Sequence, residues 1–118
     1  MVFAAGSRPL AVLEMLAHLP RQYVPQDAVI VPLEIPGNLV SGLPDMPKGW
    51  NDFPYRTASR MIGDRWIEQG SSLAMFVPSA ILPAEQNILI NPRHADFSQI
   101  RVGEPEQHAF DPRLFRLR

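Results

Sequence analysis

Apolar residues along the chain fall into short runs that prolines and glycines separate. The first run, Met1–Ala5, predicts a short buried strand. Ser7 is suited to cap a helix after it, and Pro9 falls in the first helical turn, where a missing N–H costs nothing. The segment Leu10–Leu19 therefore predicts a helix, which ends before Pro20. Apolar side chains point in nearly every direction around this segment, which is typical of a buried helix.

The middle of the chain predicts one strand, one long loop and a second helix. The β-branched run Asp27–Ile35 indicates a strand, in which Pro32 lacks a ladder donor and so favours an edge position or a bulge. From Val40 to Tyr55 the pattern is irregular, and a loop of that length in a small domain is usually functional or mobile. Thr57–Gln69 predicts a helix, and Gly70 is suited to end it.

The rest of the chain predicts short elements only. Strands are expected at Leu73–Val77, Asn87–Ile90, Ile100–Val102 and Gln107–Phe110, with one helical turn at Ala95–Gln99. Few helices and several short strands, with no regular βαβ alternation, predict an α+β domain. We expect a small mixed or antiparallel sheet with flanking helices, in one domain over residues 1–118.

Composition and charge narrow the class of protein. The 118 residues carry a net charge of −1, which removes the broad electrostatic case for nucleic acid or an anionic membrane surface. The absence of cysteine rules out a disulfide scaffold, a thiolate zinc site and a thiol nucleophile. Apolar runs fall far short of the roughly 18–20 residues that span a bilayer, and the N-terminus does not read as a signal peptide. We therefore expect a cytoplasmic protein.

Glu14 is the strongest chemical signal that the residues themselves give. It is the only charged residue in an otherwise apolar helical segment, and burying a charged carboxylate there costs several kcal/mol unless a partner satisfies it. His18 lies one helical turn further on and could be that partner. The alternative is a thin polar edge where Glu14 and His18 meet solvent.

Hydroxyl side chains are weaker candidates. Ser79 follows Pro78 at a predicted strand end, where ligand-binding groups often lie, although a serine there often only starts a turn. Thr57 and Ser59 could face a ligand, but such residues are more often helix caps. His94 is expected to be a turn residue that satisfies backbone groups. The three histidines lack the spacing of a metal site, so no metal is expected.

Taken in order, several segments resemble the RES domain, the toxin half of a bacterial toxin–antitoxin pair. The matching segments are Val2–Ala5 with Ala11–Leu19, Ile62–Trp66, Val77–Pro83, Asn87–Phe97 and Phe110–Arg113. The resemblance implies a fold similar to ADP-ribosyltransferases and an NAD⁺-degrading activity that breaks the nicotinamide–ribose bond by hydrolysis or phosphorolysis. It also implies neutralisation by an Xre-type helix-turn-helix antitoxin. NAD⁺ is then a substrate, and no cofactor is expected.

The domain is named for an arginine, a glutamate and a serine. On that pattern Glu14 matches the glutamate and Ser79 is the best match to the serine, both as catalytic residues. Ser59 is the second choice for the hydroxyl, and Phe3 is a weaker substrate-binding candidate that stands where the family usually has tyrosine. Gly6 stands where a glutamate is common.

The family arginine belongs to an upstream "GGRWN"-like segment that this sequence does not contain, and Arg8 is not assigned its role. The chain therefore resembles the C-terminal two-thirds of the domain, and we expect the sheet to lack its first strands. Two other functions stay open. One is a catalytically inactive remnant that folds or binds the antitoxin. The other is a small α+β protein that forms a homodimer to cover the exposed sheet edge.

Overall fold

The computed structural model describes residues 1–20, 23–52 and 57–115, without the side chains of residues 57–60. The two helices are α1 (Arg8–His18) and α2 (Thr57–Gln69). The strands are β1 (Val2–Ala5), β2 (Val29–Ile30), β3 (Leu33–Glu34), β4 (Val40–Ser41), β5 (Ala74–Pro78), β6 (Gln86–Ile90), β7 (Arg101–Val102) and β8 (Glu106–Gln107). Short 3₁₀ turns lie at Gly37–Leu39, Phe97–Gln99 and Pro112–Phe115. Two helices and mixed sheets confirm the α+β class.

A four-stranded sheet in the order β1-β6-β5-β4 forms the centre of the fold. β6 lies antiparallel between β1 and β5, and β4 joins β5 in parallel. The register sets Phe3 opposite Leu89, and Leu89 opposite Met75, so these three side chains share one face of the sheet. The next row on that face holds Ala5, Asn87 and Val77 in the same way.

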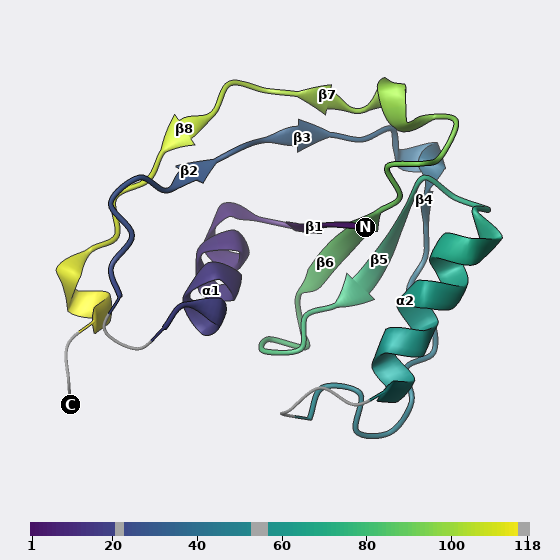
Figure 1. The fold of residues 1–118 in the computed structure, drawn as a ribbon, viewed down its shortest axis with the longest axis horizontal. Helices are drawn as coiled ribbons and strands as arrows, with labels where there is room; N and C mark the ends of the chain where they lie inside the picture. Colours follow the sequence, from purple (N-terminus) through teal and green to yellow (C-terminus); the bar gives the residue numbers. More distant parts are fainter. Residues whose placement is uncertain (21–22, 53–56, 116–118) are drawn as a thin grey trace.

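Each face of this sheet carries its own apolar cluster. On one face, Trp66 of α2 packs with Met75 and Leu89, and all three side chains are buried. On the other face, Leu73, Ala74 and Ile90 form a second buried cluster, which partly buried residues of β3, β4 and the turn between them cover. In Figure 1, α2 lies beside β4 and β5, while α1 lies at the opposite end of the strand order, next to β1. The sheet is therefore covered near β5 and left open toward β1.

The segment predicted as one strand over Asp27–Ile35 is instead two short strands. β2 pairs with β8 and β3 pairs with β7, in two separate two-stranded sheets that form the long arm above α1 in Figure 1. Between the pairs, residues 31–32 face residues 103–105, so one strand carries an extra residue. Pro32 has no N–H to donate there, and its carbonyl accepts from the Gly103 amide at 2.8 Å. The prediction of a single strand was wrong, and Pro32 lies between the two short strands.

Helix α1 begins as predicted but is not buried. Ser7 is its N-cap and accepts from the Leu10 amide at 3.2 Å. Leu10 is the only fully buried residue of the helix, while Leu13 and Met15 are 39% and 40% exposed. The expected burial was wrong because an all-round apolar pattern cannot distinguish a helix surrounded by protein from one that lines a cavity.

Most of the remaining helix and strand predictions are confirmed, while one strand is displaced and another was not predicted. The helix Thr57–Gln69 is confirmed, and Gly70 ends it with a φ of +59°. The strands at residues 73–77, 87–90 and 100–102 and the turn at 95–99 are confirmed within two residues. The last strand lies at Glu106–Gln107 rather than Gln107–Phe110, and β4 was not predicted. No helix within the described ranges is both long and apolar enough to cross a membrane.

Candidate functional site

Backbone contacts at the N-terminal end of α1 fix this helix against the central sheet. The Gly6 amide donates to the carbonyl of Gln86 at 3.0 Å, and Ser7 then caps the helix. Gln86 begins β6, and Asn87 follows it in the same strand. The start of α1 is thereby held next to the strand residue that the Glu14 carboxylate contacts.

The carboxylate of Glu14 accepts two hydrogen bonds from the two sides of the β5–β6 hairpin, close to the turn that joins the strands. The Ser79 hydroxyl donates to Glu14 Oε1 at 2.7 Å, and Asn87 Nδ2 donates to the same oxygen at 2.7 Å. Glu14 is half-buried, whereas Ser79 is fully buried. The structure thus brings together Glu14 and Ser79, which lie 65 residues apart in the chain.

Ser79 also organises the turn that joins β5 to β6. Its amide donates to the carbonyl of Glu85 at 2.9 Å, and its Oγ accepts from the amide of Leu82 at 3.1 Å. Ser79 therefore starts the turn, and its hydroxyl also donates a hydrogen bond to Glu14.

The sequence offered His18 as a partner for the Glu14 carboxylate, and the structure shows that this interpretation was wrong. Its Nδ1 lies 2.7 Å from the backbone carbonyl oxygen of Glu14 and not from a side-chain oxygen. The i+4 spacing places the ring over the helix backbone, so it satisfies a carbonyl of the last turn. Among the described residues, neutral donors alone contact the Glu14 carboxylate, with no arginine or lysine in ion-pair range.

A cavity of about 1250 Å³ borders this carboxylate. Glu14 and Asn87 line it, together with Phe3, which is 71% exposed on β1. The lining also includes Ala11, Val12, Met15 and Leu19 of the α1 segment, Ile62, Gly63 and Asp64 of α2, and Met46 and Trp50 from the loop after β4. The lining is mostly apolar and surrounds few polar groups, which is the usual composition of a small-molecule site.

Two other residues considered from the sequence are Ser59 and Arg8. Ser59 belongs to α2, but its side chain lies outside the described residues, so its candidacy stays a prediction. Arg8 and Glu106 also line the cavity, and Arg8 donates to Glu106 Oε1 from Nε and Nη2 at 3.1 and 2.7 Å. Within the described ranges, no group of three or more metal-ligating side chains is placed to hold an ion.

The family model of the RES domain matches residues 1–111. The chain belongs to the RES domain family. Curated relatives support the assignment over nearly the whole chain. A protein named "Prs ADP-ribosylating toxin" from Sphingobium sp. (strain YBL2) is 33% identical over 121 residues, which is 98% of this chain and 75% of the relative.

Two further relatives are both named "Toxin Res". The protein of Yersinia enterocolitica is 35% identical over 116 residues, covering 96% of this chain and 76% of the relative. The protein of Photorhabdus laumondii is 36% identical over 120 residues, covering 99% of this chain and 77% of the relative. This RES domain is therefore similar to toxins over most of their length.

Sequence reasoning missed Asn87 as a functional candidate in this RES domain. A signal was present, because Asn87 shares a strand face with Leu89, and a polar amide in an aliphatic strand requires a partner. That partner, Glu14, lies 73 residues away in the chain. Local pattern alone could not connect the two.

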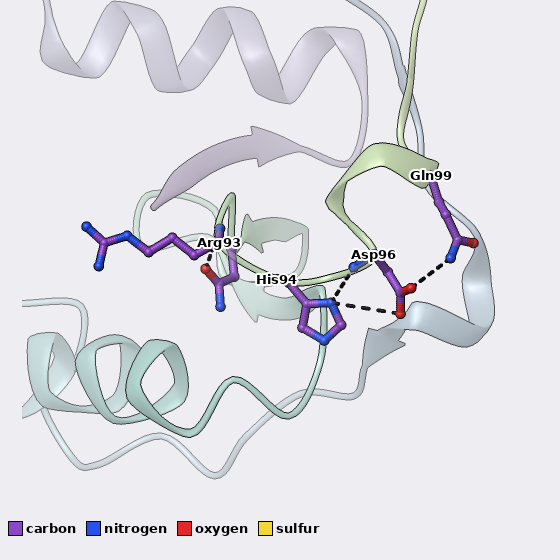
Figure 2. A network of polar contacts seen from close by, with 5 residues as sticks. Arg93, His94, Asp96 and Gln99 are labelled. Carbon is purple, nitrogen blue, oxygen red and sulfur yellow. Dashed lines mark hydrogen bonds and ion pairs between the residues drawn. The ribbon is translucent and has the colours of Figure 1, made fainter.

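The segment after β6, by contrast, has a structural role in this RES domain, as predicted for His94. Figure 2 shows its side chains bonded to one another and to the local backbone. Asn91 Oδ1 accepts from the Arg93 amide at 3.0 Å, and His94 Nδ1 accepts from the Asp96 amide at 3.0 Å. Gln99 Nε2 donates to Asp96 Oδ1 at 2.8 Å. These polar groups serve the turn rather than a ligand.

Proposed function

We propose that this RES domain binds NAD⁺ and breaks the bond between nicotinamide and ribose, with Glu14 as the catalytic carboxylate. The observation that carries the proposal is a half-buried carboxylate, held by two neutral donors, at the wall of a large and mostly apolar cavity. Small-molecule sites usually measure about 300–1,000 Å³. A cavity of about 1250 Å³ therefore has room for a dinucleotide.

The chemistry requires a negative charge without a protein cation beside it. When the C1′–N bond breaks, its electron pair goes to the pyridinium nitrogen, neutral nicotinamide leaves, and the ribose gains oxocarbenium character. A carboxylate near C1′ stabilises that positive charge and can align an incoming nucleophile. Because the Glu14 carboxylate contacts neutral donors, its negative charge stays available for this role.

The acceptor of the ADP-ribosyl group is water or phosphate in our first proposal. Water gives ADP-ribose after it loses a proton, and phosphate gives the 1″-phosphate ester. One relative is named an ADP-ribosylating toxin, which favours transfer to a protein side chain as a second candidate. All three reactions begin with the same bond cleavage at the same carboxylate.

Nicotinamide release from NAD⁺ by the purified 118-residue chain is the direct test. We expect release by the wild type and loss of at least about 100-fold on Glu14→Gln, since removing one transition-state electrostatic group costs about 10²–10³. Glu104→Gln, at an exposed loop position, is the matched control and should leave the rate unchanged. Reactions with and without phosphate, and with a bacterial lysate as protein acceptor, separate the three acceptors. No release under any of these conditions would overturn the proposal and favour the inactive remnant.

We also propose that the chain is the toxin of a toxin–antitoxin pair with an Xre-type antitoxin. The names of the toxin relatives support this assignment. Expression of the chain should arrest bacterial growth and lower cellular NAD⁺, and co-expression of the antitoxin should restore growth. Growth arrest that persists in Glu14→Ala would contradict the assignment of this carboxylate.

A further inference from the structure

Ser79 lies behind Glu14 rather than beside the ligand space. Its exposed fraction is 0%, and it does not line the cavity, although its neighbours Pro78 and Ala80 do. Its proton already goes to Glu14 Oε1, and its oxygen already accepts from the amide of Leu82. The hydroxyl has one proton, so it cannot donate to an NAD⁺ amide or ribose oxygen without releasing Glu14.

Asn87 is held in its orientation at a cost. Its Nδ2 donates to Glu14 Oε1, and its Oδ1 is buried with no hydrogen-bond partner within the described structure. A buried unsatisfied acceptor costs about 1–3 kcal/mol. Turning the amide over would set its oxygen against the carboxylate oxygen, which is worse. The Asn87 side chain therefore keeps its hydrogen bond to Glu14 even though its own Oδ1 stays unpaired.

We propose that Asn87 and Ser79 are positioning residues that fix Glu14 Oε1, so that Oε2 is the oxygen presented to the C1′ centre of NAD⁺. This inference rests on the proposed function and adds to it a separate role for each of the two carboxylate oxygens. Both donors converge on one oxygen, and no partner of Oε2 is found among the described residues. Fixing one oxygen holds the plane of the carboxylate and leaves the other free of protein donors that would weaken its charge.

The kinetic test is the division between kcat and KM. Asn87→Leu and Ser79→Ala should each lower kcat for nicotinamide release by about 10–100-fold, the usual effect of losing a residue that orients a reacting group. KM for NAD⁺ should stay within about twofold, because Ser79 does not line the cavity and the donor group of Asn87 is already bonded to Glu14. The exposed substitutions Asn38→Leu and Ser71→Ala are the matched controls. A raised KM at unchanged kcat would overturn the proposal, because it would place the residue on the substrate.

A thermal-unfolding cycle tests the arrangement without activity. In a Glu14→Ala background, Asn87→Leu removes an amide that has lost its only partner, so it should raise Tm by about 4 °C or more. In the wild type the same change also removes a bond to a carboxylate, so the rise should be smaller or absent. Equal effects in both backgrounds would overturn the proposed contact. If the effects of Glu14→Ala and Asn87→Leu on Tm are coupled but the protein releases no nicotinamide, the proposed function is overturned. The positioning of Oε1 by Asn87 is then still supported.

Discussion

The amide of Gly6 donates to the carbonyl of Gln86 at 3.0 Å, and a Cβ on Gly6 would lie 2.8 Å from the same oxygen. That approach is too close for any side chain, because the oxygen it would meet belongs to the backbone and cannot turn aside. Any residue larger than glycine at this position would meet the same carbonyl. The hydrogen bond also ties the start of α1 to the strand that holds Asn87.

Gly6→Ala should therefore destabilise the fold and disturb the carboxylate together. We expect a loss of about 1–3 kcal/mol, the cost of forcing extra atoms into a packed site, and hence a Tm lower by about 4–12 °C. Nicotinamide release should fall as well, since α1 must shift relative to Gln86. Gly42→Ala is the control, because nothing lies within 4 Å of a Cβ there. Equal Tm values for the two variants would contradict the close approach.

The cap of α1 gives a second, milder prediction. Ser7→Ala removes the acceptor of the Leu10 amide and should cost about 1 kcal/mol, the usual effect of losing an N-cap. Tm should fall by about 4 °C, and kcat should change little, because the Gly6 contact still holds the helix start. Ser71→Ala, at an exposed position without secondary structure, should leave Tm unchanged. A large loss of kcat would mean that the cap, rather than Gly6, positions Glu14.

Local signals predicted the elements that depend on neighbouring residues. The Ser7 cap and the Gly70 stop each act within one helical turn, so sequence alone placed both helices within two residues of their observed ends. The short strand Val40–Ser41 was missed because its parallel partner, Ala74–Met75, lies more than 30 residues away. The prediction that α1 is buried was wrong for the same reason, since burial depends on which other elements cover the helix.

The candidate site was partly accessible from sequence. Glu14 was identified because a carboxylate among apolar residues needs an explanation, and Ser79 because it matches a family motif. Their hydrogen bond joins a helix to a strand end across 65 residues, and no periodic pattern encodes that contact. Asn87 carries a local signal, an amide in an aliphatic strand, but its partner became visible only with the sheet register and the position of α1.

A chain of side-chain hydrogen bonds joins α2 to the sheet and gives a third prediction. Trp66 Nε1 donates to Ser72 Oγ at 2.8 Å, and Ser72 Oγ donates to Ser41 Oγ at 3.1 Å. Ser72→Ala leaves the indole N–H of a buried tryptophan without a partner, which should cost about 1–3 kcal/mol. Denaturant unfolding followed by tryptophan fluorescence measures the loss. Ser71→Ala is the adjacent control, and equal stability of the two variants would contradict the bond.

Asp111 provides a prediction about pH. The side chain of Arg113 donates to it through Nε and Nη2, and its amide donates as well, so these bonds hold the pKa of the Asp111 carboxyl below its ordinary value. A lowered folded pKa adds stability that is present above the ordinary aspartate pKa and is lost as the pH falls through the folded value. NMR titration should show Arg113→Ala returning the Asp111 pKa toward its ordinary value. Arg101→Ala should not change it, and a pKa unmoved by Arg113→Ala would contradict the pairing.

Arg8 gives the last prediction, which concerns whether this arginine of the cavity wall holds the dinucleotide. Its guanidinium pairs with Glu106 at 2.7 Å on the surface, where both side chains are well exposed, and such pairs contribute about 0–1 kcal/mol. Arg8→Ala should therefore change Tm by no more than about 4 °C.

KM for NAD⁺ should also be unchanged in Arg8→Ala, because Glu106 already occupies the guanidinium and leaves little charge for a diphosphate. The reverse change, Glu106→Gln, separates the alternatives, since it frees Arg8 without removing it. If Arg8 holds the dinucleotide, Glu106→Gln should lower KM and Arg8→Ala should raise it by about tenfold or more, the value of a charged hydrogen bond. Equal KM values for NAD⁺ in the two variants and the wild type would confirm that Arg8 is a surface partner of Glu106 and does not replace the family arginine.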